Sequence, residues 1–479
     1  MLVNLGDKTM VERSIKKAST YYLVGNIFNK GIAFLTVPIF TRILSTSDYG
    51  IVTTYNSWVG ILSMVIGFAL HMSIRMAAVD YKEKFNDFVS SIILFVILTS
   101  TVMIAITATV MKVLHINISI ILVVLCMLQA YATATIEDYS NYLMMQYRYR
   151  FRTALMVLPN LVSAIFSVLA ILFVFTSEQF LGRIIPTAIV TFFFGIIVLM
   201  LTLKKGKCKI NLEYIKYAMT ISAPLILHGI ALNILSQSDR IMITALADSA
   251  QTGIYSLIYN FGMIATVITT ALEGVWVPWF IMKLNSNKRT EIESVANDYI
   301  HFMTYAMGCL ILVAPEVVKI LANKNYWEGI SIIPPIVLAN YIIFAYSLYV
   351  NIEQFYKKTL YISLNTIIAA VSNIVLNYIF IPKYGYVAAA FTTVVSYLIS
   401  FFLHSRYARK LEPTLYPMQK FFVPLLHLTV ITILFYMFQE NGIVRWIGMI
   451  AYIIVILFKE RKRIMFYFPE ISKKITKKV

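Results

Sequence analysis

Long uninterrupted runs of apolar residues alternate with short polar stretches along nearly the whole chain. A helix needs about 20 apolar residues to cross the hydrocarbon core of a bilayer, which is roughly 30 Å thick. Because the runs are continuous, they favour spanning helices over strands. The sequence therefore predicts an all-α integral membrane protein with about 14 transmembrane helices, at approximately residues 21–43, 51–72, 87–111, 117–137, 153–176, 181–203, 216–246, 252–275, 297–321, 331–353, 359–381, 386–405, 419–438 and 442–458.

Composition supports this interpretation. Hydrophobic residues make up 59% of the 479 residues, charged residues 13%, and the mean hydropathy is +0.76. A soluble protein carries about 25% charged residues, so most of this surface must face lipid. The net charge of +18 does not indicate a nucleic-acid partner, because basic clusters between apolar segments follow the positive-inside rule.

The positions of the basic residues predict the orientation. With a cytoplasmic N-terminus, 32 of the 41 Lys and Arg residues lie in the predicted cytoplasmic segments. This asymmetry places both termini of the multi-pass protein in the cytoplasm. The first apolar segment follows charged residues and lacks a small-residue cleavage site, so we expect a spanning helix and not a removed signal peptide.

Four glycines suggest an internal repeat. Gly50 and Gly182 are separated by the same number of residues as Gly253 and Gly385, and each begins an even-numbered span after an outer loop. Chance spacing of turn glycines is the alternative. The repeat predicts two parallel six-helix lobes, residues 1–210 and 211–412, followed by an extra helix pair and basic tail, residues 413–479. Residues 8–20 and the polar connection 282–298 are expected to lie on the membrane surface.

No pattern of catalytic or metal-binding residues occurs. The six histidines and three cysteines are scattered, and no HExxH, GxSxG or P-loop pattern is present. We therefore expect no enzyme activity, no cofactor and no metal site.

Lys30 is the one basic residue without an aqueous location. It lies about 15 Å deep in the first span, beyond the reach of snorkelling. Asn26 shares its face, Asn29 lies beside it, and Arg42 ends the same helix. Two interpretations remain: Lys30, with these neighbours, binds a ligand, or it forms a structural pair with a carboxylate elsewhere.

Further charged residues lie in the second lobe. Asp239 and Arg240 are adjacent within one span, so one of them faces the cavity and the other pairs across helices; the sequence leaves open which. Glu273 is the candidate carboxylate for coupling transport to an ion. The alternative is that it is simply exposed at the membrane interface. Arg75 and Glu353 are expected at the interface, and Asn365, Asn373 and Asn377 form a polar seam typical of helix packing.

The first six spans contain Lys30 but no acidic residue except Glu137 and Asp138 at a cytoplasmic end. A cavity with cations and few carboxylates favours an anionic cargo, such as a diphosphate or an acidic sugar.

Three stretches carry a resemblance to a known family: NIFNKGIAFLTVPIFTRILSTSDYG, LSQSDRIMI with TGIYSLIYN, and NIVLNYIFIPKYGYVAAAFTTVVSYL. In order, and across about residues 10–410, they resemble the polysaccharide-transport branch of the multidrug/oligosaccharidyl-lipid/polysaccharide exporter superfamily. This branch includes the O-antigen and capsule repeat-unit flippases.

The resemblance implies a flippase that moves an undecaprenyl-diphosphate-linked oligosaccharide to the outer leaflet by alternating access, coupled to a proton or sodium ion. It places this flippase in the bacterial plasma membrane, and by position it carries functional roles over to Lys30, Asp239 and Arg240. Together with the positions argued above, the predicted substrate-binding residues are Lys30, Asn26, Asn29, Arg42 and Arg240, and the predicted coupling residues are Asp239 and Glu273. The expected partners are the glycolipid, the ion, the bilayer and a polysaccharide polymerase. The alternatives are a multidrug or cation antiporter and a lipid II flippase, whose branch also carries an extra helix pair.

Overall fold

The computed structural model describes residues 31–32, 35–115 and 119–461. Within these ranges every regular element is a helix. Eleven helical stretches of the described chain are long and apolar enough to cross a membrane. The predicted all-α membrane fold is confirmed. The first predicted span lies largely outside the described residues, and its outer end, residues 35–43, is helical.

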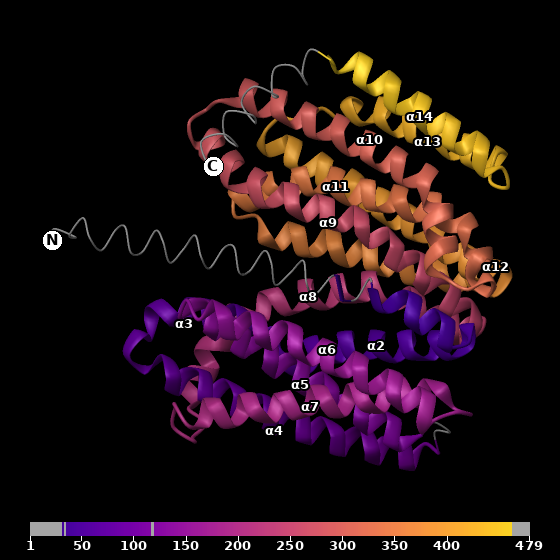
Figure 1. Ribbon diagram of the computed structural model, residues 1–479. Helices are drawn as coiled ribbons and strands as arrows, with labels where there is room; N and C mark the ends of the chain where they lie inside the picture. Colours follow the sequence, from indigo (N-terminus) through magenta and orange to yellow (C-terminus); the bar gives the residue numbers. More distant parts are fainter. Residues whose placement is uncertain (1–30, 33–34, 116–118, 462–479) are drawn as a thin grey trace, which may run out of the picture. The chain divides into compact units, whose positions relative to one another are not determined.

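The remaining predicted spans each have a helical counterpart (Figure 1). In the first half of the chain these are α2 (Thr46–Gly67), α4 (Phe85–Val113), α5 (Ile120–Met145), α6 (Tyr149–Phe173) and α7 (Gln179–Leu203). The short helix α3 (His71–Asp80) follows α2 and corresponds to no predicted span of its own. The second half contains α8 (Leu212–Leu246), α9 (Ser249–Asn285), α10 (Arg289–Leu321), α11 (Ile333–Phe355), α12 (Thr359–Leu411), α13 (Phe422–Met437) and α14 (Gly442–Lys459).

Helix α12 contains two of the predicted spans, which are separated by a kink at Gly385. This glycine has φ 59° and ψ −146°, a conformation essentially restricted to glycine. The side-chain oxygen of Gln251 accepts a hydrogen bond of 3.0 Å from the amide of Tyr386, directly after the kink. The glycine that the repeat assigned to the start of a span therefore marks the boundary between two helices.

The polar connection at 282–298 is mostly helical. Helix α9 continues to Asn285 and α10 begins at Arg289, so the two helices are joined by a tight turn. Asn287 occupies the left-handed region in this turn, with φ 56°. The polar residues thus form the ends of two long helices, and their location at the membrane surface stays a prediction.

The chain forms two compact units. Unit 1 comprises residues 1–256 and 360–389, and unit 2 comprises residues 257–359 and 390–479. Within unit 1, α7 packs beside α5 and α6, and α2 packs against α5 and α8 (Figure 1). Within unit 2, α10 packs against α11, α13 and α14. The proposed lobe boundaries at residues 210 and 412 remain predictions.

The extra helix pair is attached to α10 through both apolar and charged contacts. Gly308 of α10 leaves room for Ile431 of α13 and Tyr452 of α14, with which a Cβ at this position would overlap. Arg445 of α14 is 2% exposed and forms an ion pair with Glu316 of α10. Arg445, which lies outside the predicted cytoplasmic segments, is therefore buried between helices.

Candidate functional site

The predicted substrate contacts at Lys30, Asn26 and Asn29 lie outside the described residues. Arg42 is described, and it is exposed near the end of the helical segment 35–43. The sites at these four positions remain predictions.

Asp239 lies at the centre of a buried polar cluster in unit 1. Its carboxylate is 1% exposed and accepts hydrogen bonds from the hydroxyl of Tyr255, at 2.5 Å, and from the amide nitrogen of Asn377, at 2.7 Å. The amide nitrogen of Asn377 also donates to the side-chain oxygen of Asn373, at 3.1 Å, as does the hydroxyl of Ser238. The cluster thus joins α8, α9 and the first half of α12.

The cluster gives two residues of the predicted polar seam a more specific position. Asn373 and Asn377 are both fully buried and belong to the hydrogen-bond network around Asp239. Sequence reasoning assigned them to helix packing and did not select Tyr255. The spacing of Asn373 and Asn377 by one turn on an apolar helix was the available signal.

Arg240 turns back toward its own helix. Its guanidinium donates to the carbonyl oxygen of Ser236, at 3.0 Å, and to the side-chain oxygen of Gln237, at 3.1 Å. The side chain is buried, with 7% exposure. These hydrogen bonds of Asp239 and Arg240 thus go to different partners, because adjacent helical positions point about 100° apart.

Glu273 belongs to unit 2, on α9, where it is half-buried. Its carboxylate lies close enough to the phenol of Tyr346 on α11 to interact with it electrostatically. Glu353, expected at the interface, is fully buried and forms an ion pair with His404 of α12. The expectation that Glu353 lies at the interface was wrong. The sequence did not reveal its ion-pair partner, because His404 lies on a different helix.

The two glycines that the repeat makes equivalent, Gly50 and Gly253, meet at the starts of α2 and α9. A Cβ on Gly50 would overlap with the carbonyl oxygen of Ser249, and one on Gly253 would overlap with that of Thr46. The contact is therefore reciprocal, as expected for two repeats related by a two-fold axis. Small residues spaced four apart on both helices allow this close approach of the backbones.

Hydroxyl groups continue this crossing. The Ser256 hydroxyl of α9 donates to that of Thr53 of α2 at 3.0 Å. Beside them, the hydroxyls of Thr54 of α2 and Thr244 of α8 lie 2.6 Å apart. Within lipid, such groups stabilise helix contacts because they satisfy each other's hydrogen bonds. We call this set, from Thr46 to Thr53 and from Ser249 to Ser256, the glycine crossing.

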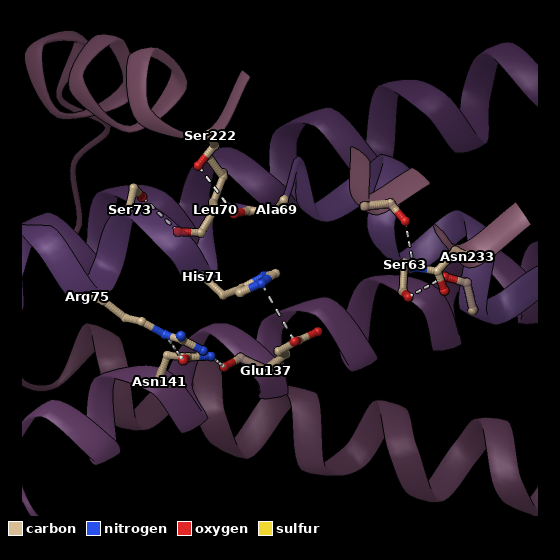
Figure 2. Close-up of polar contacts among 12 residues, drawn as sticks. Ser63, Ala69, Leu70, His71, Ser73, Arg75, Glu137, Asn141, Ser222 and Asn233 are labelled. Carbon is tan, nitrogen blue, oxygen red and sulfur yellow. Dashed lines mark hydrogen bonds and ion pairs between the residues drawn. The ribbon is translucent and has the colours of Figure 1, made fainter. Parts of the chain in front are cut away.

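Figure 2 shows the C-terminal end of α2, where the chain turns into α3. Phe68 and Ala69 both occupy the left-handed region, with φ 48° and 49°. The hydroxyl of Ser222 on α8 donates to the carbonyl oxygen of Ala69, at 3.3 Å. The bend is thus fixed by a contact with α8, at a helix end where two non-glycine residues carry backbone strain.

Charged residues follow directly after this bend (Figure 2). The guanidinium of Arg75 donates through Nε to the side-chain oxygen of Asn141, at 2.8 Å, and Arg75 remains exposed. His71 lies 3.9 Å from the carboxylate of Glu137. These contacts place the cationic side chain of Arg75 within α3, just beyond the predicted inner end of the span at 51–72.

Among the described residues, no group of three His, Cys, Asp or Glu side chains lies close enough to hold a metal ion. The oxygen-rich cluster around Asp239 consists mainly of amide and hydroxyl groups. Such hard oxygen donors suit a small alkali cation or a proton.

Comparisons with known proteins agree with this architecture. The chain is 22% identical over 410 residues to a protein of Haloferax volcanii described as a probable low-salt glycan biosynthesis flippase, Agl15; the match covers 82% of this chain and 83% of the relative. Among solved structures, the lipid II flippase MurJ in an inward closed conformation matches with a TM-score of 0.68 and 16% identity, over 92% of this chain and 99% of MurJ.

An inward-facing multidrug resistance MATE family transporter of the MOP superfamily matches with a TM-score of 0.59 and 11% identity, over 80% of this chain and 96% of the transporter. At these identities, the structural matches establish the fold. The model of a family described as polysaccharide biosynthesis protein matches residues 15–283, which is more than half of the chain. The protein therefore belongs to the polysaccharide biosynthesis protein family.

Proposed function

We propose that the protein is a flippase that moves an undecaprenyl-diphosphate-linked oligosaccharide from the inner to the outer leaflet of a bacterial plasma membrane. Both termini lie in the cytoplasm, and the cargo is a repeat unit for O-antigen, capsule or exopolysaccharide. Family membership and the named relatives support a glycolipid as cargo.

The glycine crossing is the observation that carries this proposal. It joins α2 and α9, which begin near the equivalent glycines of the two predicted repeats, by reciprocal backbone contact at their predicted outer ends. A transporter that exposes its site alternately to each side needs a contact that closes one end and separates as the repeats rock. Interfaces held by small residues and hydroxyls suit this purpose, because they are tight without an apolar core.

The cargo is recognised by its negative charge. Lys30 holds the diphosphate or an acidic sugar at mid-membrane depth, with Asn26 and Asn29 beside it. Arg42 and Arg240 provide further cationic contacts. Arg240 is held by Ser236 and Gln237 in the state described, so its engagement of a ligand requires a change of rotamer. Charge-assisted hydrogen bonds to phosphate are stronger than neutral ones, which favours these side chains.

The transport is coupled to a proton or a sodium ion at Asp239, with Glu273 as a second coupling residue. The carboxylate of Asp239 is buried and already surrounded by amide and hydroxyl groups. A buried carboxylate gains most from an ion or proton that neutralises it, because its desolvation is otherwise costly.

The cargo assignment is tested with purified protein in liposomes that contain a fluorescent undecaprenyl-diphosphate oligosaccharide. Exposure of the label to an impermeant quencher measures translocation. We expect Lys30→Ala to lower the rate at least tenfold and Lys30→Arg to restore part of it. Lys112→Ala, which removes an exposed lysine at the end of α4, is the matched control. Wild-type rates from Lys30→Ala would contradict the assignment of Lys30.

Competing cargoes distinguish the alternatives. A lipid II flippase would move lipid II faster than the oligosaccharide lipid, and a multidrug antiporter would move organic cations instead. In cells, loss of surface polysaccharide in the Lys30→Ala strain, at an unchanged protein level, would support the proposal. Co-purification with a polysaccharide polymerase would identify that enzyme as a partner.

A further inference from the structure

Unit 2 contains a completely buried pair of titratable side chains that the proposed transport steps do not use. Glu353 lies in the last turn of α11 and His404 lies in the second half of α12. They are 0% and 1% exposed, and the Nδ1 atom of His404 lies 2.8 Å from the Oε2 atom of Glu353. The pair thus links two helices of unit 2 through a single polar contact.

Aromatic rings cover the pair on one side. The ring of Tyr346 stacks on that of His404, with centroids 5.5 Å apart and an interplanar angle of 15°. Tyr346 also stacks on Tyr397, at 6.2 Å and 20°. On each helix, the tyrosine precedes its pair member by two turns and shares its face. The stack excludes water from the pair.

One oxygen atom of the pair remains unsatisfied. The Oε1 atom of Glu353 has no hydrogen-bond partner within the described parts of the chain. A buried carboxylate with one free oxygen and no counter-charge would be very costly. With one proton on the pair, the carboxylate and the imidazolium carry no net charge. Burial therefore favours the state that holds one proton.

Other titratable groups surround the pair and its stacked rings. Tyr259 and Glu273 of α9 lie close enough to Tyr346 to interact with it electrostatically, and Arg409 of α12 does so with Tyr349 of α11. Glu412, at the end of α12, is bound by Arg289 through two hydrogen bonds of 2.7 and 2.9 Å and by Tyr356. Because Glu412 already has its own cation, it does not replace Glu353 as the partner of His404.

We propose that Glu353 and His404 form a proton-binding site, which binds one proton when α11 and α12 close on the pair and releases it when they separate. When water enters, a solvated histidine loses its proton above about pH 6.5, while the glutamate stays ionised. The proton leaves to water, and the pair keeps a carboxylate and a neutral imidazole. The closed state thus binds one proton more than the open state above this pH, so acidification favours closure.

The protonation state is tested on the purified full-length protein by nitrogen NMR of labelled histidines. We expect His404 to be an imidazolium at pH 8 in the wild type and neutral in Glu353→Gln. His427, whose Nε2 atom lies 2.8 Å from the Tyr452 hydroxyl, is the internal control and is expected to be neutral at pH 8. A neutral His404 in the wild type at pH 8 would overturn the proposal.

The signal of His404 is assigned by its loss in His404→Gln. If that variant fails to fold, replacing the other five histidines one at a time leaves the His404 signal by elimination. The assignment then does not depend on any change at the pair itself.

The second test measures the link to conformational change, and this part rests on the proposed function. Between pH 6.5 and 8.5, the wild-type translocation rate is expected to change by up to tenfold per pH unit, as for one linked proton. His404→Gln should lose the part of this response that the proton at the pair contributes, while any part that comes from proton coupling at Asp239 remains. His427→Gln should behave as the wild type. An unchanged pH response in His404→Gln would overturn the proposal. If no protein moves the glycolipid, the proposed function fails, and the NMR result still decides whether the pair holds the proton.

Discussion

Gly50 of α2 and Gly253 of α9 pack against each other's helices so closely that neither position has room for a side chain. Each glycine faces a backbone carbonyl of the other helix. The two residues occupy equivalent places in the internal repeat, so the contact lies where the repeats are related to each other. This contact would be lost if the two helices separated.

We expect Gly50→Ala to push α2 and α9 apart, because the added Cβ meets backbone atoms that cannot rotate away. The measurement is disulfide formation between Thr53→Cys and Ser256→Cys, whose hydroxyls lie 3.0 Å apart in the parent protein. In a protein without its native cysteines, cross-linking should fall severalfold when Gly50→Ala is added. Gly274→Ala, with no atom within 4 Å of the new Cβ, should leave it unchanged. Equal cross-linking in both variants would exclude a glycine-dependent contact.

We expect Asp239→Asn to remove the dependence of translocation on an imposed proton or sodium gradient. The substitution removes the charge and leaves either Tyr255 or Asn377 without its carboxylate acceptor, at a cost of about 1–3 kcal/mol. Translocation is measured in liposomes with each gradient imposed separately. Tyr255→Phe keeps the carboxylate, so it should weaken the response without abolishing it. Full gradient dependence in Asp239→Asn would rule out Asp239 as the coupling residue.

We expect Gly385→Ala to lower stability by about 1–3 kcal/mol, since its backbone conformation is costly for any residue with a Cβ. The new Cβ would also overlap with the side-chain oxygen of Gln251. Thermal unfolding in detergent measures the effect. Gln251→Ala removes the hydrogen bond to the Tyr386 amide but leaves the backbone conformation intact, so its cost should be smaller. A larger loss from Gln251→Ala would show that the bond, and not the kink, is critical.

The ion pair of Glu412 with Arg289 predicts a pH dependence of stability. The hydrogen-bonded guanidinium of Arg289 holds the pKa of Glu412 below its usual range. A lowered pKa in the folded state stabilises the protein above the ordinary pKa of glutamate, and this contribution is lost as the pH falls through the folded value. Glu412→Gln should therefore unfold several degrees below the wild type at pH 7, with the difference shrinking in acid.

Glu291→Gln is the matched control for this measurement. Glu291 also pairs with two lysines, but it is exposed, and exposed ion pairs contribute little. Its unfolding temperature should stay near that of the wild type at both pH values. A loss in Glu412→Gln that persists in acid would assign the effect to packing instead of charge.

Local sequence features predicted much of the fold. Apolar runs long enough to cross a bilayer are a property of contiguous residues, which explains why spans two to fourteen have helical counterparts. Gly385 marked a boundary for a similar reason, since its backbone conformation is available to glycine alone. Composition did not show that two helices extend into the polar connection near Asn287, because a polar helix end and a polar loop have similar residues.

The sequence by itself determined the helical membrane fold and the candidate charges, because these depend on hydropathy and residue type. The internal repeat stays a prediction from glycine spacing. The tertiary structure decided which of these charges are paired. Glu353 is buried because His404 reaches it from another helix, and Asp239 is surrounded because Tyr255 and Asn377 come from two further helices. Burial and hydrogen bonding between distant residues follow from helix packing, which no local pattern encodes.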